Sequence, residues 1–211
     1  KSAALNESTG AITILQLEQS LEAHWKLDET ASTTAADSSG NGRDANVTSP
    51  VWETDGYVEG ALSLDGSQTY ADAPATGISG DVARSVSGWV YHDGVAQAGS
   101  GEVGVFGFFA PSPAAREMFS LELHDNSGQD VWVWNLGEED FAFPELSAGW
   151  HHFSLCYDNR NLRGYLNGHM VIRKKFAGFE AGLSTVDNFL IGQRPDTGGM
   201  FEGKVDGVRI Y

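Results

Sequence analysis

The sequence is poor in cysteine, basic residues and long apolar runs, and each shortage excludes a class of protein. Its 211 residues include one cysteine, Cys156, so we expect no disulfide and a buried free thiol. Only 13 basic residues stand against 29 acidic ones, and the formal net charge of -16 argues against nucleic acid and anionic membrane surfaces as partners. No run approaches the roughly 18 apolar residues of a membrane-spanning helix, so no membrane insertion is expected.

What the sequence does contain is short alternating strands separated by turn residues. Phe153, Leu155 and Tyr157 alternate with polar or small neighbours, which is typical of a strand with one face against a core. The pair Asn167-Gly168 closes the next run and favours a type I′ hairpin turn. About a dozen such strands without a helical period predict an all-β antiparallel sandwich or jelly roll.

The length and the 26 glycines suit one large domain. Residues 1–20 differ in character, so we interpret them as a linker or docking segment and residues 21–211 as the domain. The chain begins at Lys1 with neither Met nor a signal peptide. We therefore expect a processed or excised part of a larger polypeptide.

The segment Asp37-Ser38-Ser39-Gly40-Asn41-Gly42-Arg43-Asp44 is dense in oxygen donors and turn formers. Side-chain oxygens and glycine-freed carbonyls are what a hard cation such as Ca²⁺ requires of a loop. An Asx-rich turn without metal has the same composition. Both interpretations stay open from the residues alone.

Eight blocks, in this order, resemble the laminin-G-like domains of the concanavalin A-like lectin/glucanase superfamily. They are WKLDE (25–29), DSSGNG (37–42), GALSLDG (60–66), VSGWV (86–90), WHHF (150–153), GYLNG (164–168), IG (191–192) and GKVDGVRIY (203–211). The resemblance covers about residues 21–211. It implies a concanavalin A-like jelly roll of two curved antiparallel sheets, used as a module of secreted or cell-surface bacterial proteins.

The resemblance also implies a structural calcium ion. Carried over by position, its donors are Asp37 and Asn41, with Asp206 a weaker candidate. The family often has an acidic residue where this chain has Gly207, so the C-terminal part of that site departs from the family pattern.

Hydrolases of the superfamily place closely spaced carboxylates on one strand, because two carboxylates must flank the scissile bond. Glu122 and Asp125 have the wrong spacing, and residues 138–140 fall in an expected loop. No G-x-S-x-G elbow is present. We therefore predict that the protein is not an enzyme, and a glycoside hydrolase is the least favoured alternative.

Aromatic residues are the candidate ligand contacts. Trp132 and Trp134 share one face of a strand, where they form a stacking platform for sugar rings if exposed and core if buried. Trp89 and Tyr91 also share a face, and the same two interpretations, ligand platform or core, apply to them. The adjacent residues His151 and His152 point to opposite faces of a strand and so cannot bind one ion together.

These observations predict a non-catalytic binding or adhesion module for glycans or an extracellular protein partner. The alternative is a structural or interaction domain that packs against other parts of a larger polypeptide. Either role implies an extracellular, periplasmic or cell-surface location.

Overall fold

The computed structural model describes residues 20–73, 78, 82–97, 101–109, 118–136, 139–175 and 188–211. Residues 1–19 of the predicted linker lie outside this part. Within it no residue is helical, and accordingly no helix is long and apolar enough to cross a membrane.

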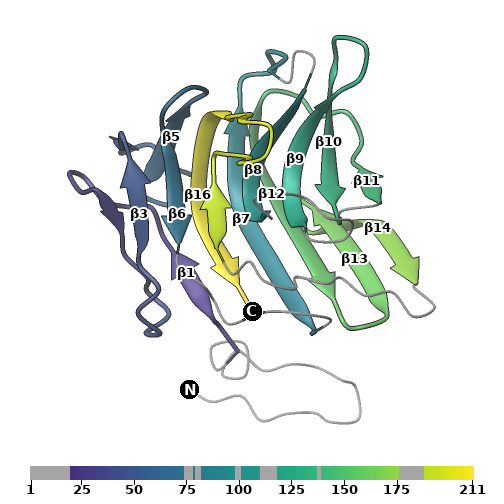
Figure 1. Ribbon diagram of the computed structural model, residues 1–211, viewed down its shortest axis with the longest axis horizontal. Helices are drawn as coiled ribbons and strands as arrows, with labels where there is room; N and C mark the ends of the chain where they lie inside the picture. The colour runs from purple at the N-terminus through teal and green to yellow at the C-terminus, as the bar shows by residue number, and fades with distance from the viewer. Residues whose placement is uncertain are drawn as a thin grey trace.

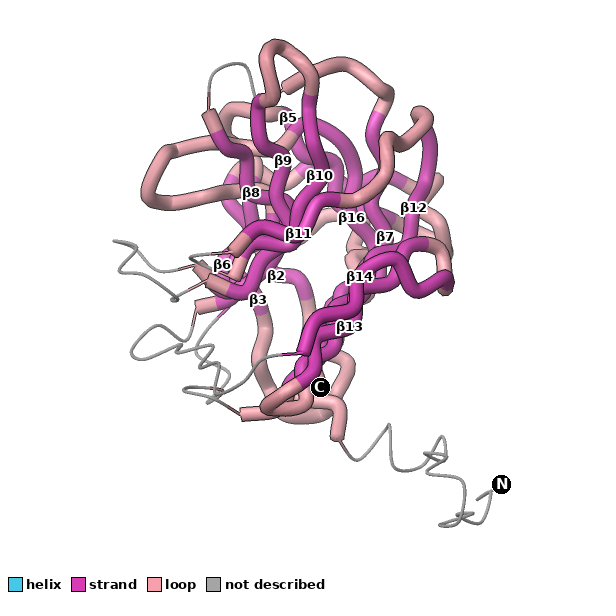
Figure 2. Tube along the Cα trace, turned by 90° about the vertical axis from the view of Figure 1, so that its right-hand side faces the viewer, coloured by secondary structure: helices cyan, strands magenta, loops and turns pink. Residues whose placement is uncertain are grey.

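Two antiparallel sheets form the molecule, each with eight strands among the described residues. Sheet A has the order β14 (His169–Lys175), β13 (Asn161–Leu166), β12 (Gly149–Tyr157), β7 (Arg84–His92), β16 (Glu202–Ile210), β5 (Ala61–Asp65) and β4 (Val51–Glu53), with β1 (Ala23–Trp25) also paired to β16. Sheet B has the order β11 (Asp140–Ala142), β10 (Asp130–Asn135), β9 (Phe119–Asp125), β8 (Glu102–Phe108), β15 (Phe189–Ile191), β6 (Tyr70–Ala73), β3 (Ala45–Thr48) and β2 (Thr34–Ala35). Figure 1 shows the sheets from one face and Figure 2 shows the two layers edge-on. The predicted two-sheet jelly-roll sandwich is confirmed.

Alternation along the strands decides which side chains enter the space between the layers. In β12 Phe153, Leu155 and Tyr157 are buried, as predicted, whereas the intervening side chains face outward. The predicted hairpin turn follows β13, and Asn167 and Gly168 have φ angles of 50° and 79°. The expectation that Cys156 is buried is wrong. Cys156 alternates with the inward-facing Phe153 and Leu155, so it lies on the outer side of β12 and is only half-buried.

Aromatic rings join the two layers. Trp25 of sheet A stacks on Phe189 of sheet B with 5.3 Å between ring centroids, and Trp132 of sheet B stacks on Phe153 of sheet A at 5.1 Å. Trp134 is fully buried beside Phe106. Such rings bury the most apolar area per residue, so these contacts dominate the stability of the sandwich.

Candidate functional site

The four aromatic residues predicted as ligand contacts separate into two pairs. Trp132 and Trp134 are 4% and 0% exposed and belong to the core, so the prediction that they form an exposed platform is wrong. Their indoles are large enough to span the space between the sheets, which makes the core interpretation the correct one. Trp89 and Tyr91 lie on the outer face of β7 and are half-buried.

An aromatic patch does exist, on the outer face of sheet A. It consists of five side chains: Tyr57, Trp89, Tyr91, Trp150 and His152. Tyr57 stacks on Trp89 with 3.3 Å between ring centroids, and Trp89 meets the edge of His152 at 4.8 Å. Trp150 makes edge contacts with Tyr91 at 5.6 Å and with Tyr57 at 6.3 Å.

Strand register builds most of the patch. β7 and β12 are neighbours, and their pairing sets Trp89 opposite His152 and Tyr91 opposite Trp150. Directly opposed residues on one face of an antiparallel pair lie within contact distance. The inward neighbours of these residues are buried, so the aromatic rings are left on the outside.

Tyr57 arrives from another part of the chain, the loop 54–60 between β4 and β5. Two carboxylates hold this loop against sheet A. The Val58 N–H donates to Asp206 Oδ2 at 2.7 Å, and the Gly60 N–H donates to Asp28 Oδ1 at 2.9 Å. Gly60 has no room for a side chain, because a Cβ there would lie 2.9 Å from the Asp28 Cα. The loop is therefore fixed close enough for Tyr57 to cover Trp89.

The patch encloses an open hollow of about 570 Å³. Its walls are Tyr57, Trp89, Trp150 and His152, and the hairpin turn Asn167-Gly168 forms its rim. Asn167 is already committed, because its backbone and its side-chain oxygen both bind the backbone of His152. The hollow thus has rigid aromatic walls and a preformed edge.

His152 supplies the polar chemistry of the hollow. Burial, and then the charge of Arg209, lowers the pKa of His152 below its usual value, so the ring is neutral at pH 7. Neither ring nitrogen has a hydrogen-bond partner among the residues with described positions. A neutral imidazole with free nitrogens offers one donor and one acceptor to a ligand.

Two of the five side chains of this patch were identified from the sequence as ligand contacts. Trp89 and Tyr91 were named because they share a face of one strand. Trp150 and His152 could also have been found, because they alternate with the buried Phe153 along β12 and must therefore face outward. Tyr57 carries no signal, since it lies in a loop without periodicity and meets Trp89 only in the folded chain.

A second cavity, of about 400 Å³, opens at one end of the sandwich, and Trp132 reaches it. Among its lining residues, Gln97 and Asp130 are held by hydrogen bonds, whereas the buried His92 Nε2 has no hydrogen-bond partner in the described part of the chain. The Gln97 N–H donates to Asp130 at 2.6 Å, and the Gln97 side chain exchanges two hydrogen bonds with the backbone of Glu202. We take the aromatic patch as the candidate ligand site, because it gathers several aromatic rings around one surface hollow.

The loop predicted to hold calcium is organised by hydrogen bonds. Asp37 Oδ1 accepts from the N–H groups of His24 and Ser39, and Oδ2 accepts from the Ser39 hydroxyl and the Arg43 N–H, all within 3.0 Å. Burial raises the pKa of Asp37, but these hydrogen bonds outweigh it and hold the pKa below its usual value. Because an ionised carboxylate has about four lone-pair sites, this one has none left for a metal.

The other two predicted ligands contact other parts of the protein. The Asn41 amide donates to the carbonyl oxygens of Leu21 and Glu22, and Asp206 lies under loop 54–60. Across the described ranges, no group of three His, Cys, Asp or Glu ligands includes Asp37 or Asp206. The arrangement fits an Asx-rich turn and does not fit a calcium cage; calcium binding itself stays a prediction.

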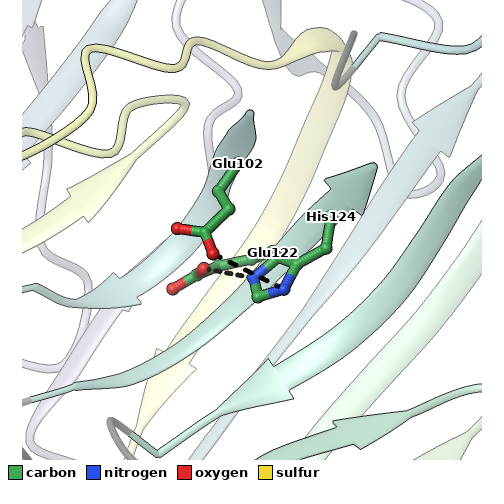
Figure 3. A group of neighbouring side chains, drawn as sticks. All are labelled: Glu102, Glu122 and His124. Atoms are coloured by element: carbon green, nitrogen blue, oxygen red, sulfur yellow. Dashed lines mark hydrogen bonds and ion pairs between the residues drawn. The ribbon is translucent and has the colours of Figure 1, made fainter. Parts of the chain in front are cut away.

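Sheet B presents a different surface on its outer face, the charged cluster formed by Glu102, Glu122, His124, Asp140 and Arg194. Figure 3 shows the first three of these side chains converging from β8 and β9. Glu122 is fully buried and binds Arg194, and His124 Nε2 lies 2.9 Å from Glu122 Oε2. Arg194 also lies 2.6 Å from Glu102, while His124 lies 3.3 Å from Asp140.

Gly104 of β8 lets the segment that carries Arg194 approach the sheet. A Cβ at Gly104 would lie 2.6 Å from the Gln193 carbonyl oxygen and 2.7 Å from the Arg194 nitrogen. Burial alone would lower the pKa of His124, but hydrogen bonds to Asp140 and Glu122 raise it to about 9. His124 is therefore a cation at neutral pH, next to the carboxylates of Glu122 and Asp140.

The charged cluster bears on the hydrolase alternative, because Glu102 and Glu122 are carboxylates on neighbouring strands. A glycosidase needs both carboxylates free to face the substrate. Here Glu122 has no exposed surface, and Arg194 bridges it to Glu102. The geometry is that of a structural ion-pair network.

Comparison with known proteins identifies the family. A model described as the concanavalin A-like lectin/glucanases superfamily, of laminin G type, matches residues 65–211, more than half of the chain. The chain belongs to this superfamily. No curated protein sequence matches it.

Within the superfamily fold, several solved structures are similar to this chain. Domain 4 of AbnA, a GH43 extracellular arabinanase from Geobacillus stearothermophilus in complex with arabinotriose, has a TM-score of 0.67 and 20% identity, over 90% of this chain and 91% of that one. The binding domain of botulinum neurotoxin serotype D/C has a TM-score of 0.64 and 12% identity, over 92% and 49%. Trypanosoma rangeli sialidase has a TM-score of 0.66 and 15% identity, over 92% and 30%. The chain thus spans half or less of the toxin domain and the sialidase, and these likenesses show the fold.

Proposed function

We propose that this protein is a non-catalytic carbohydrate-binding module that holds neutral glycans on the aromatic patch of sheet A. The observation that supports this proposal most directly is the hollow lined by Tyr57, Trp89, Trp150 and His152, in which the His152 ring nitrogens have no hydrogen-bond partner among the described residues. Aromatic faces stack on the apolar faces of sugar rings, and a few fixed polar groups orient them. The net charge of -16 disfavours acidic glycans.

Two further observations support this proposal. The similar AbnA domain was solved with arabinotriose bound, which makes a sugar a reasonable ligand class for the same fold. In the charged cluster of sheet B, Arg194 forms ion pairs with both Glu102 and Glu122, so these carboxylates are not free to act on a substrate, which supports a role without catalysis. An extracellular location within a larger polypeptide is part of the proposal.

Calorimetry with a panel of neutral oligosaccharides, including arabinotriose, xylotetraose, mannotetraose and cellotetraose, tests the function. Trp150→Ala should weaken binding by at least tenfold, because a ring-stacking wall is lost, whereas Trp150→Phe should retain much of the affinity. Tyr70→Ala, a half-buried tyrosine of sheet B, is the matched control for Tyr57→Ala. Unchanged affinity in both Trp150→Ala and Tyr57→Ala would refute the proposal.

An extracellular protein is the second candidate partner, and one observation favours it. Val58 is 58% exposed and Tyr57 is 49% exposed, side by side on loop 54–60. Exposed apolar side chains next to aromatic rings also suit a protein interface. Failure of every glycan, together with retention of a partner protein that Tyr57→Ala releases, would favour this alternative.

A further inference from the structure

A smaller cavity, of about 200 Å³, adjoins the aromatic patch beneath loop 54–60. Trp89 forms part of both, so the indole that stacks under Tyr57 is also a wall of this cavity. Its other polar walls are Asp206, Asp28, Glu59, His24, Lys26 and Arg209. The cavity therefore joins an apolar stacking surface to a concentrated set of hydrogen-bonding groups.

Asp206 is the most unusual of these groups. It is 2% exposed, yet no cation lies within ion-pair distance of it among the described residues. Burial and the negative charge of Asp28 raise the pKa of Asp206 to about 6, against the opposing effects of the Val58 N–H and Arg209. A buried carboxylate with this little compensation remains a strong acceptor for a further donor.

His24 presents the complementary case. Its Nε2 is buried and has no hydrogen-bond partner in the described part of the chain. Burial, then the charges of Arg209 and Lys26, lower the pKa of His24 to about 4, so the ring is neutral at pH 7. Unpaired buried polar atoms are uncommon in folded proteins and mark sites where another group completes the hydrogen bonding.

The mixture of donors and acceptors selects among ligand groups. A sugar carboxylate would face Asp206 and Asp28, and an ammonium group would face Lys26 and Arg209, so either charge meets repulsion. A hydroxyl group both donates and accepts, and adjacent hydroxyls can donate to a carboxylate while accepting from a nitrogen. Neutral hydroxyl groups match this cavity best.

We propose that this cavity holds adjacent hydroxyl groups of the sugar unit that stacks on the aromatic patch, with Asp206 and His24 as the specificity-determining residues. The inference rests on the proposed function and restricts the ligand class to neutral sugars with free neighbouring hydroxyls. Sugars methylated or deoxygenated at those positions are rejected, because the buried polar atoms would lose their partners.

Asp206→Asn is the decisive variant, because an Asn side chain can still accept the Val58 N–H while it removes the charge. At pH 7.5, calorimetry with the tightest-binding oligosaccharide of the panel should show at least a tenfold loss of affinity. Discrimination against the O-methylated sugar should shrink in parallel. Asp158→Asn, in the exposed turn at the far end of β12, is the control with the same change of charge.

A pH series adds a measurement that misfolding would not mimic. The charged or titratable groups around Asp206 are Asp28 and Glu59, which are acidic, and Lys26, Arg209 and His24, which are basic. Wild-type affinity should fall as the pH drops from 7 to 5, whereas Asp206→Asn should show a flat profile over that range.

The outcomes separate the two proposals. If Trp150→Ala loses affinity while Asp206→Asn binds like the wild type at every pH, the cavity assignment is overturned and the carbohydrate function stands. If the wild type binds no sugar of the panel, both fall. A drop in affinity together with a flat pH profile for Asp206→Asn supports the assignment.

Discussion

The two outer faces of the sandwich carry buried carboxylates in opposite states. On sheet B, Glu122 is surrounded by Arg194, His124, Ser120 and Asn135 and is fully satisfied. On sheet A, Asp206 is almost as deeply buried but has backbone N–H donors in place of cations. A satisfied network maintains structure, whereas an under-compensated group beside an aromatic hollow is typical of a binding site.

The largest expected effect comes from breaking the network of sheet B. Glu122→Ala should destabilise the protein by about 3–5 kcal/mol, because Arg194 and His124 would keep their burial and lose their partner. Urea unfolding monitored by tryptophan fluorescence measures the loss. Glu145→Ala, an exposed glutamate, is the control and should change stability little. A loss no larger than that of the control would show that the network contributes nothing to stability.

On sheet A we expect removal of the buried carboxylate of Asp206 to stabilise the protein. The folded pKa of Asp206, about 6, lies above the usual aspartate pKa of 3.8, so the folded state binds more protons between these values and stability falls as the pH rises through them. Asp206→Asn should therefore stabilise the protein at pH 7.5 by about 1–3 kcal/mol. Unfolding at pH 4 and pH 7.5 gives the measurement. A destabilised variant at pH 7.5 would show that the carboxylate is well compensated after all.

His124 gives a pH signature for sheet B. Its folded pKa of about 9 exceeds the usual histidine pKa of 6.5, so its contribution to stability is complete below pH 6.5 and is lost as the pH rises through 9. We expect the wild type to lose about 1–3 kcal/mol between pH 6.5 and 9.5 relative to His124→Gln. Parallel pH profiles of the two proteins would contradict this assignment.

The smallest effect concerns calcium. Because the Asp37 carboxylate is saturated by hydrogen bonds, we expect neither EDTA nor 10 mM Ca²⁺ to move the thermal midpoint. Differential scanning fluorimetry provides the test, with Asp37→Asn for comparison. A midpoint that rises with Ca²⁺ in the wild type but not in Asp37→Asn would confirm the calcium prediction and require the turn to rearrange.

The fold was largely predictable because strand alternation and turn residues are local signals. The regular pattern of Phe153, Leu155 and Tyr157 gave the inner face of β12 directly. The orientation of β10 was not predictable, because Val133 is buried as well as Trp132 and Trp134, so neither face of that strand is polar. When both faces of a strand are apolar, the sequence no longer shows which face points into the core.

The site was predictable only where it lies on regular strands. Trp89 was identified from its face, but Tyr57 is brought to it by a loop held by Asp206 and Asp28. Similarly, Glu122 and Arg194 are 72 positions apart in the sequence and meet only through the sheet. Contacts of this kind depend on tertiary arrangement, and no local pattern encodes them.

Loop 54–60 has a consequence for how such modules diversify. It connects two adjacent strands, β4 and β5, at the margin of sheet A, and it is anchored to the rest of the protein by the backbone N–H groups of Val58 and Gly60. A side chain at position 57 can therefore be exchanged without disturbing any strand pairing. Libraries randomised at this position, on an otherwise unchanged framework, offer a direct route to modules with altered ligand preference.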